Sequence, residues 1–125
     1  MATSICWSSG RLVVSAWSAI TKKLVIREYW TLVEGLARTC PAYSLAEDIP
    51  FFKSKGVIGI YSESTPDYGA AALTIWLAGR LMWDTEADTE ELMRDFHGGM
   101  YGPAAAVMRR YSDSIVSIGR GRGEA

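Results

Sequence analysis

The sequence predicts an α/β domain, and three observations lead to this class. Two short β-branched stretches, 24–26 and 57–61, are separated and flanked by segments with helical periodicity. Strands that alternate with helices are expected to pair in parallel. The chain has 125 residues, of which 49% are hydrophobic, and this suffices for the core of one domain.

The composition excludes several other classes. The net charge of -1 lacks the basic surplus of a duplex nucleic-acid binder, so no nucleic-acid partner is expected. No apolar run approaches the roughly 20 residues that span a bilayer, so no membrane contact is expected. Cys6 and Cys40 match no zinc motif and are too few for a disulfide scaffold. We therefore predict unpaired thiols, no metal and no cofactor.

The first predicted helix covers residues 9–21 and carries one apolar stripe, formed by Leu12, Val13, Ala16, Trp17 and Ile20. A strand follows at 24–26 and turns polar and aromatic at 27–30. Its successive apolar residues predict burial on both faces, which is typical of a parallel sheet.

A second helix is predicted around residues 45–53, after a segment, 31–43, without clear periodicity. Ser44 is one candidate for its N-cap. Because Pro50 removes a hydrogen bond from a helix interior, a start near Asp48 fits better. Gly56 is expected to end this helix.

The second strand, 57–61, leads into polar residues and a loop at 66–69. The next segment, 70–83, is helical and almost wholly apolar, and we expect it to be largely covered. Trp76 and Trp83 lie seven residues apart, which places both on one predicted core face.

Two further helices are predicted after a turn at 84–87. Asp88 or Thr89 caps the first of them, and Gly98-Gly99 ends it. Pro103 occupies the favoured first position of the last helix, which ends near Gly119.

Two stretches in the C-terminal part of the chain resemble the C-terminal end of a known domain family. Residues 81–88 read LMWDTEAD, and residues 100–105 read MYGPAA, with MRRY following at 108–111. This order resembles an uncharacterised domain family of large bacterial carbohydrate-active proteins. That family is similar to the α-glucuronidase and hexosaminidase class of TIM-barrel glycoside hydrolases. The resemblance extends upstream to the pair Glu28-Tyr29, and it covers about residues 12–115.

The resemblance implies that this chain is a partial (β/α)8 barrel followed by a helical segment. Residues 24–30 and 57–63 resemble the last two barrel strands, and a whole barrel needs about 250 residues. We therefore expect the first five or six strands to be missing. The expected division is a barrel portion at 1–83, a helical extension at 84–119 and a disordered tail at 120–125. The localisation stays open, because no signal peptide is visible, although the resemblance implies an exported parent.

The candidate chemistry lies at the carboxyl ends of the two strands, where such barrels carry their active sites. Glycoside hydrolysis uses two carboxylates, and Glu28 and Glu63 are the candidates for these roles. The alternative is that either one pairs with a cation such as Arg27. The candidate sugar contacts are aromatic, and packing is the alternative role for each: Tyr29, Trp30 and Tyr61.

We predict that the chain is a fragment of a glycoside hydrolase. The intact parent is expected to act on oligosaccharides, including those that bear uronic acid. We do not expect the isolated chain to be active. The alternative is a non-catalytic helical interaction or carbohydrate-binding module that pairs with a second chain through exposed strand edges. A nucleotide-binding unit is disfavoured, since the glycine fingerprint is missing.

Other polar residues in the C-terminal half are assigned structural roles. His97, the only histidine, is expected to favour the dipole at a helix end. Asp84, Asp88 and Glu91 lack the spacing of a calcium loop, so turn and capping roles are expected for them.

Overall fold

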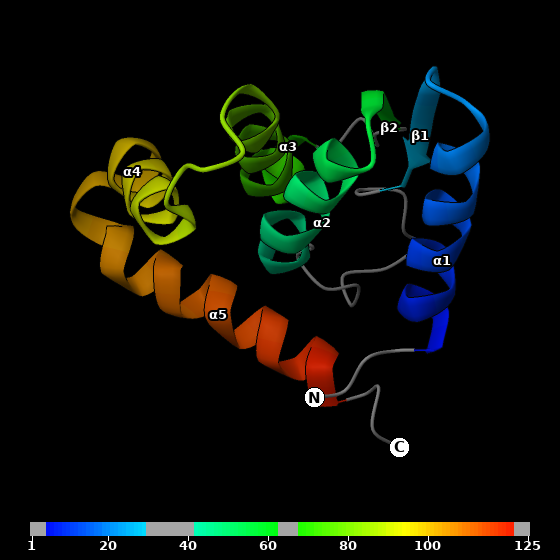
Figure 1. The fold of residues 1–125 in the computed structure, drawn as a ribbon. Helices are drawn as coiled ribbons and strands as arrows, with labels where there is room; N and C mark the ends of the chain where they lie inside the picture. Colours follow the sequence, from blue (N-terminus) through cyan, green and yellow to red (C-terminus); the bar gives the residue numbers. More distant parts are fainter. Residues whose placement is uncertain (1–4, 30–41, 63–67, 122–125) are drawn as a thin grey trace.

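The computed structural model describes residues 5–29, 42–62 and 68–121, and shows a mostly helical α/β fold (Figure 1). The α/β class is as predicted. The elements follow in the order α1 (Ile5–Ile20), β1 (Leu24–Glu28), α2 (Ala42–Ser54), β2 (Val57–Ser62), α3 (Tyr68–Trp83), α4 (Thr89–Tyr101), the 3-10 turn η1 (Gly102–Ala104) and α5 (Ala105–Gly121).

The sheet of the described residues has two strands, β1 and β2, which pair in parallel as predicted. Leu24 pairs with Val57 and Val25 with Gly59, so the register shifts by one residue at this point. From Ile26 onward the pairing is regular and ends with Glu28 opposite Ser62. Both strands therefore finish at the same edge of the sheet.

The two faces of this sheet have different environments. Ile26 is partly buried, and Ile60 packs against the main hydrophobic cluster. Val25, Ile58 and Tyr61 are each more than half exposed. The predicted burial on both faces is therefore wrong, because the helices that pack on this sheet cover only one face.

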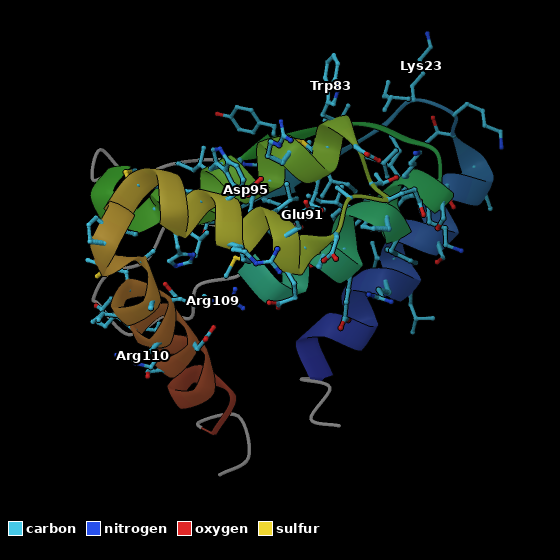
Figure 2. All side chains as sticks on the ribbon, turned by 90° about the vertical axis from the view of Figure 1, so that its left-hand side faces the viewer. Lys23, Trp83, Glu91, Asp95, Arg109 and Arg110 are labelled. Carbon is cyan, nitrogen blue, oxygen red and sulfur yellow. The ribbon has the colours of Figure 1, made fainter. Side chains whose placement is uncertain are left out.

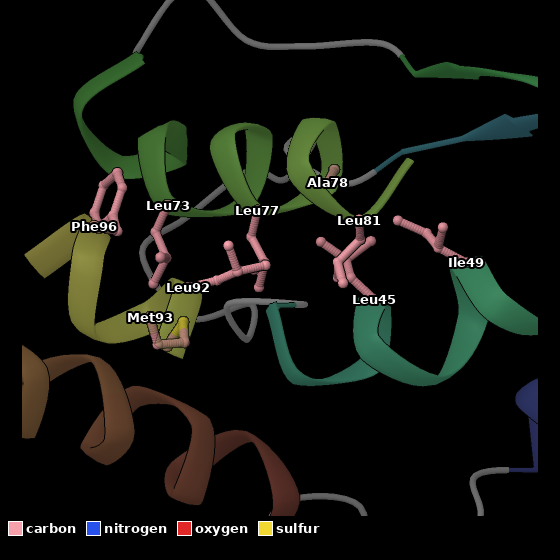
Figure 3. Close-up of a cluster of buried hydrophobic side chains, with 9 residues drawn as sticks. All are labelled: Leu45, Ile49, Leu73, Leu77, Ala78, Leu81, Leu92, Met93 and Phe96. Atoms are coloured by element: carbon pink, nitrogen blue, oxygen red, sulfur yellow. The ribbon is translucent and has the colours of Figure 1, made fainter. Parts of the chain in front are cut away.

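The main core lies between helices rather than on the sheet. Nine buried side chains from α2, α3 and α4 meet there (Figure 3): Leu45, Ile49, Leu73, Leu77, Ala78, Leu81, Leu92, Met93 and Phe96. The α3 leucines recur every four residues and so form one row along the helix. This row faces α2 and α4, which makes α3 the central element of the core.

The two tryptophans of α3 have different environments. Trp76 packs on Phe96, with ring centroids 5.5 Å apart. Trp83 is 91% exposed and projects away from the ribbon (Figure 2). The prediction of a shared core face is wrong for Trp83, because α3 ends there and the chain turns away before α4 begins. Ile75 and Met82 are also exposed, so α3 is less completely covered than predicted.

Helix α2 begins at Ala42, six residues before the predicted start at Asp48, and Pro50 lies inside it. Ser44 is accordingly a helical residue and not the N-cap. Buried positions continue at spacings of three and four on both sides of the proline, at Leu45, Ile49 and Phe52. Packing against α3 thus outweighs the lost backbone hydrogen bond. Gly56 ends the segment as predicted, with a positive φ of 72°.

Helix α4 begins as predicted and ends later. The Asp88 carboxylate accepts hydrogen bonds from the backbone N–H groups of Glu90 and Glu91, which confirms it as the N-cap. The helix continues through Gly98-Gly99 to Tyr101, so the predicted end is wrong. Its last turn is held by the Tyr101 ring, which contacts Phe96. Gly102, with φ of 49°, makes the turn, and Pro103 lies in η1 before α5.

Candidate functional site

Of the five predicted site residues, the structure describes three. Glu63 and Trp30 lie outside the described residues. Glu28 is the last residue of β1, Tyr29 follows it directly, and Tyr61 lies near the end of β2. All three are thus at the predicted carboxyl edge of the sheet.

Tyr29 and Tyr61 lie on either side of Arg27. Arg27 pairs with Tyr61 across the sheet, and its Cζ atom is 6.0 Å from the centroid of that ring. The same Cζ atom is 5.0 Å from the Tyr29 centroid. Both distances are within the roughly 6 Å limit of a cation–π interaction, which contributes about 0.5–1 kcal/mol at an exposed site. We call Arg27, Tyr29 and Tyr61 the aromatic platform.

The aromatic platform is open to solvent, with Tyr29 and Tyr61 exposed by 50% and 58%. Tyrosine rings offer apolar faces for the C–H groups of a sugar, and their hydroxyl edges reach polar groups. A guanidinium adds N–H donors that suit hydroxyl and carboxylate oxygens. The platform therefore has the chemistry of a surface that stacks on a polar ring.

The Glu28 carboxyl group does not belong to this platform. Glu28 alternates with Arg27 along β1 and is partly buried, on the same side as Ile26. Burial raises the pKa of Glu28, and a hydrogen bond from the Tyr29 backbone opposes this in part. Glu28 thus shares the strand end with the tyrosines but lies on the other face of the sheet.

Asp48 on α2 is a carboxyl group near Glu28 that the sequence interpretation missed as a candidate. It is buried, and desolvation raises its pKa to about 7. The charges of Glu28 and Glu47 add to this rise, while the charge of Arg11 opposes it. The sequence contained one signal for the burial of Asp48. It lies three residues after Leu45 and next to Ile49, which places its carboxyl group beside the apolar side of the helix.

Arg11 on α1 faces this carboxyl group. Its Nη2 atom lies 3.7 Å from Oδ1 of Asp48 and 3.7 Å from Oε2 of Glu47. The Oδ1 atom of Asp48 is buried and has no hydrogen-bond partner among the residues that the structure describes. The guanidinium also lies over the Phe51 ring, 4.7 Å from its centroid. Arg11 therefore attaches α1 to α2 through charge and stacking.

His97 occupies a second polar site, between α4 and α5. It is buried and lies inside α4 rather than at its end, so the predicted dipole role is wrong. Its Nδ1 atom is 2.6 Å from the Met93 carbonyl oxygen, and its Nε2 atom is 3.0 Å from Oγ of Ser112. A carbonyl only accepts, so Nδ1 carries the hydrogen of this bond. His97 thereby fastens α5 to α4.

A hollow of about 300 Å³ lies beside His97, with alanines on the α5 side. Its charged lining residues are Glu90, Arg94 and Arg109, of which Glu90 and Arg109 pair across it. Arg109 donates to Glu90 at 2.8 Å and to Asp113 at 3.1 Å. The Glu90–Arg109 ion pair thus joins α4 to α5 beside the hollow.

The acidic residues before and within α4 have structural roles. Asp84 accepts a hydrogen bond from the Glu86 backbone within the turn, and Asp88 caps the helix. Within the described residues, no group of three or more His, Cys, Asp or Glu side chains is placed to hold a metal ion. None of the described helices combines the length and apolar character that crossing a membrane requires.

The fold and the platform define an α/β domain with a parallel β-α-β unit, a helical core and an aromatic surface at the strand ends. The chain belongs to the family described as Domain of unknown function (DUF4838), whose sequence model matches residues 11–113. The predicted membership of an uncharacterised domain family is thereby confirmed. No curated protein and no solved structure shows significant similarity to the chain.

Proposed function

We propose that this chain carries part of the sugar-binding site of a glycoside-hydrolase-like protein. The aromatic platform is the observation that carries this proposal, because open α/β sheets and barrels bind ligands at the carboxyl ends of their strands. In the proposal, Tyr29, Trp30 and Tyr61 contact the sugar. The substrate class is an oligosaccharide, including those that bear uronic acid, which Arg27 suits through its charge.

Glu28 and Glu63 are the proposed catalytic carboxyl groups of the intact site; because Glu28 is the last residue of β1 and lies on the face opposite the aromatic platform, it is proposed to reach the sugar past the end of the strand. Glycoside hydrolysis needs one carboxyl group that stays protonated to act as the acid and one that acts as nucleophile or base. The raised pKa of Glu28 supports the acid role. Glu63 follows β2 directly in the sequence and is the proposed second group.

The proposal includes a barrel that is larger than the two described strands. A (β/α)8 barrel places six further strands around these two. The exposed face of β1 and β2, which carries Val25 and Ile58, supports this because it offers apolar surface for further packing. The isolated chain is therefore proposed to bind sugars weakly and not to hydrolyse them.

The experiment is a binding measurement on the purified chain against neutral and uronic-acid-bearing oligosaccharides. Calorimetry or a glycan array should detect binding, and Tyr29→Ala and Tyr61→Ala should each abolish it. Trp83→Ala is the matched control, since it removes another exposed aromatic ring far from the strand ends. Absence of binding to any glycan, or equal losses in all three variants, would contradict the proposal.

A second candidate function is a non-catalytic interaction or carbohydrate-binding module that pairs with another chain through its strand edges. The observation that favours it is that, among the described residues, β1 and β2 pair only with each other. Hydrogen exchange on the β1 amides as a function of protein concentration tests this candidate. If the β1 amides exchange more slowly as the protein concentration rises, pairing of the strand edges between chains is supported. Exchange rates that do not change with concentration contradict it.

A further inference from the structure

Helix α1 is packed with its apolar side outward. The residues on its inner side are partly buried and mainly polar: Arg11, Val14, Ser15 and Ser18. Arg11 reaches the carboxyl groups of α2, and Ser18 donates a hydrogen bond to the Ser15 carbonyl within α1. The described contacts from this side to α2 are those of Arg11, with the carboxyl groups of Glu47 and Asp48 and with the Phe51 ring.

The outer side carries the stripe that the sequence predicts. Leu12 and Ile20 are 72% and 76% exposed, and Val13 and Trp17 are each more than half exposed. Ala16 lies in the middle of this side and is exposed as well. We call these five residues the α1 stripe. No charged residue interrupts it, because Lys22 and Lys23 come only after the helix.

The exposed area of the α1 stripe is large for one helix. Large apolar side chains such as Trp carry about 150–250 Å² each, so the four large residues together expose roughly 500 Å². The largest apolar patch on a typical soluble monomer covers about 300–600 Å² and often marks an interaction site, so the α1 stripe has the size of such a site. Two such stripes in contact bury roughly 1,000 Å², which reaches the lower limit for a specific interface.

The α1 stripe is also complementary to itself. Ala16 lies at its centre, with Leu12 four residues before it and Ile20 four residues after it. A two-fold axis through Ala16 sets two α1 helices antiparallel and places Leu12 of each copy against Ile20 of the other. The small side chain at the crossing lets the backbones approach closely. Such a contact uses the same patch on both subunits, as a closed dimer requires.

We infer that a second copy of this chain covers the α1 stripe in an antiparallel α1–α1 contact. This inference does not depend on the proposed function, because the stripe contains no residue of the aromatic platform. The dimer is of modest affinity, since its area is at the lower end for specific interfaces.

The first test is the mass of the full chain in solution, by analytical ultracentrifugation over a concentration series. We expect a shift from 13.7 kDa towards twice that mass as the concentration rises. Trp17→Lys should raise the dissociation constant of the dimer by about tenfold to a hundredfold, since each copy loses a central aromatic contact. Trp83→Lys is the matched control and should leave the dimer intact, with circular dichroism confirming the fold of both variants.

A cysteine cross-link tests the orientation and does not depend on how Trp17→Lys folds. In a background with Cys6→Ser and Cys40→Ser, Ala16→Cys should form an interchain disulfide on oxidation, because the two positions meet at the axis. Ile20→Cys should not, since the two copies of residue 20 are separated by about 12 Å along the helices.

Three outcomes would overturn the inference. A wild-type chain that is monomeric at every concentration shows that something other than a second copy covers the stripe. Equal loss of the dimer in Trp17→Lys and Trp83→Lys removes α1 from the interface. Equal cross-linking of Ala16→Cys and Ile20→Cys excludes the antiparallel arrangement.

Discussion

Helices α4 and α1 are both amphipathic, but they present opposite sides to the rest of the molecule. In α4, Leu92 and Met93 are buried, and Glu91 and Asp95 face solvent (Figure 2). In α1 the apolar stripe faces solvent and Arg11 faces inward. An apolar stripe in the sequence thus predicts that one face of a helix needs to be covered. Whether another element of the same chain covers that face depends on which elements lie next to the helix.

The connections of the two helices explain the difference. A short turn at 84–88 returns the chain from α3 to α4, so the two helices pack as neighbours. Helix α1 instead leads through residues 21–23 into a strand, and it lies at the opposite end of the molecule from α4 (Figure 1). It therefore has no helix on its outer side in the described part of the chain.

The largest expected effect compares one leucine from each helix. Leu92→Ala in α4 leaves a cavity in the core and should lower the free energy of unfolding by about 2–5 kcal/mol. Leu12→Ala in α1 should change it by less than about 0.5 kcal/mol at protein concentrations where the chain is monomeric. Urea denaturation measures both. Similar losses in the two variants would mean that the α1 stripe is covered within a single chain.

The next effect concerns the buried carboxyl group that receives Arg11. The pKa of Asp48 is 3.8 in the unfolded chain and about 7 in the folded one. Between these values the folded state keeps a proton that the unfolded state has lost. Stability should therefore fall as the pH rises from about 4 to about 7 and then level off, with a loss on the order of 4 kcal/mol.

Two substitutions isolate this contribution. Asp48→Asn removes the titrating group, so the stability of this variant should no longer fall between pH 4 and pH 7. At pH 8 the variant should be more stable than the wild type, because it does not bury a charged carboxylate. Glu47→Gln is the matched control, because Glu47 is exposed and also faces Arg11. It should keep most of the slope, since desolvation is the largest cause of the raised Asp48 pKa and the Glu47 charge is a smaller one. Thermal unfolding between pH 4 and pH 8 supplies the measurement. A wild-type slope equal to that of Asp48→Asn would show that Asp48 does not titrate in this range.

The smallest effect concerns the first turn of α4. Asp88→Ala removes the acceptor of two backbone N–H groups and should cost about 1 kcal/mol. Asp95→Ala, in the middle of the same helix and exposed, should cost less than about 0.5 kcal/mol. Urea denaturation compares the two, and an Asp95 loss as large as that of Asp88 would exclude a specific capping effect.

Local patterns in the sequence predict much of the fold. The β-branched runs around Ile26 and Ile60 predict two parallel strands, and Asp88 predicts the start of α4. Gly56 predicts the end of α2, because only its backbone tolerates a positive φ easily. Each of these features depends on residues that are close in the sequence.

The features that the sequence did not predict depend on contacts between distant residues. Pro50 lies within α2 because packing against α3 holds the helix on both sides of it. The exposure of Trp83 depends on where α4 begins to cover α3, and the burial of Asp48 depends on the approach of α1. For the candidate site, the position of Tyr29 at the strand end was predictable from the order of the elements. That Glu28 lies on the covered face and Tyr29 on the open face depends on which side of the sheet the helices cover, and this is set by contacts between distant residues.

The hydrogen bonds around His97 have a consequence for how α5 is held against α4. The Ser112 hydroxyl lies 3.0 Å from Nε2 of His97 and 3.1 Å from the Met108 carbonyl oxygen. The hydroxyl carries one hydrogen, so it donates either to Nε2 of His97 on α4 or to the carbonyl oxygen within α5. The rotation of a single hydroxyl therefore decides whether α5 receives this hydrogen bond from α4 or keeps it within its own backbone.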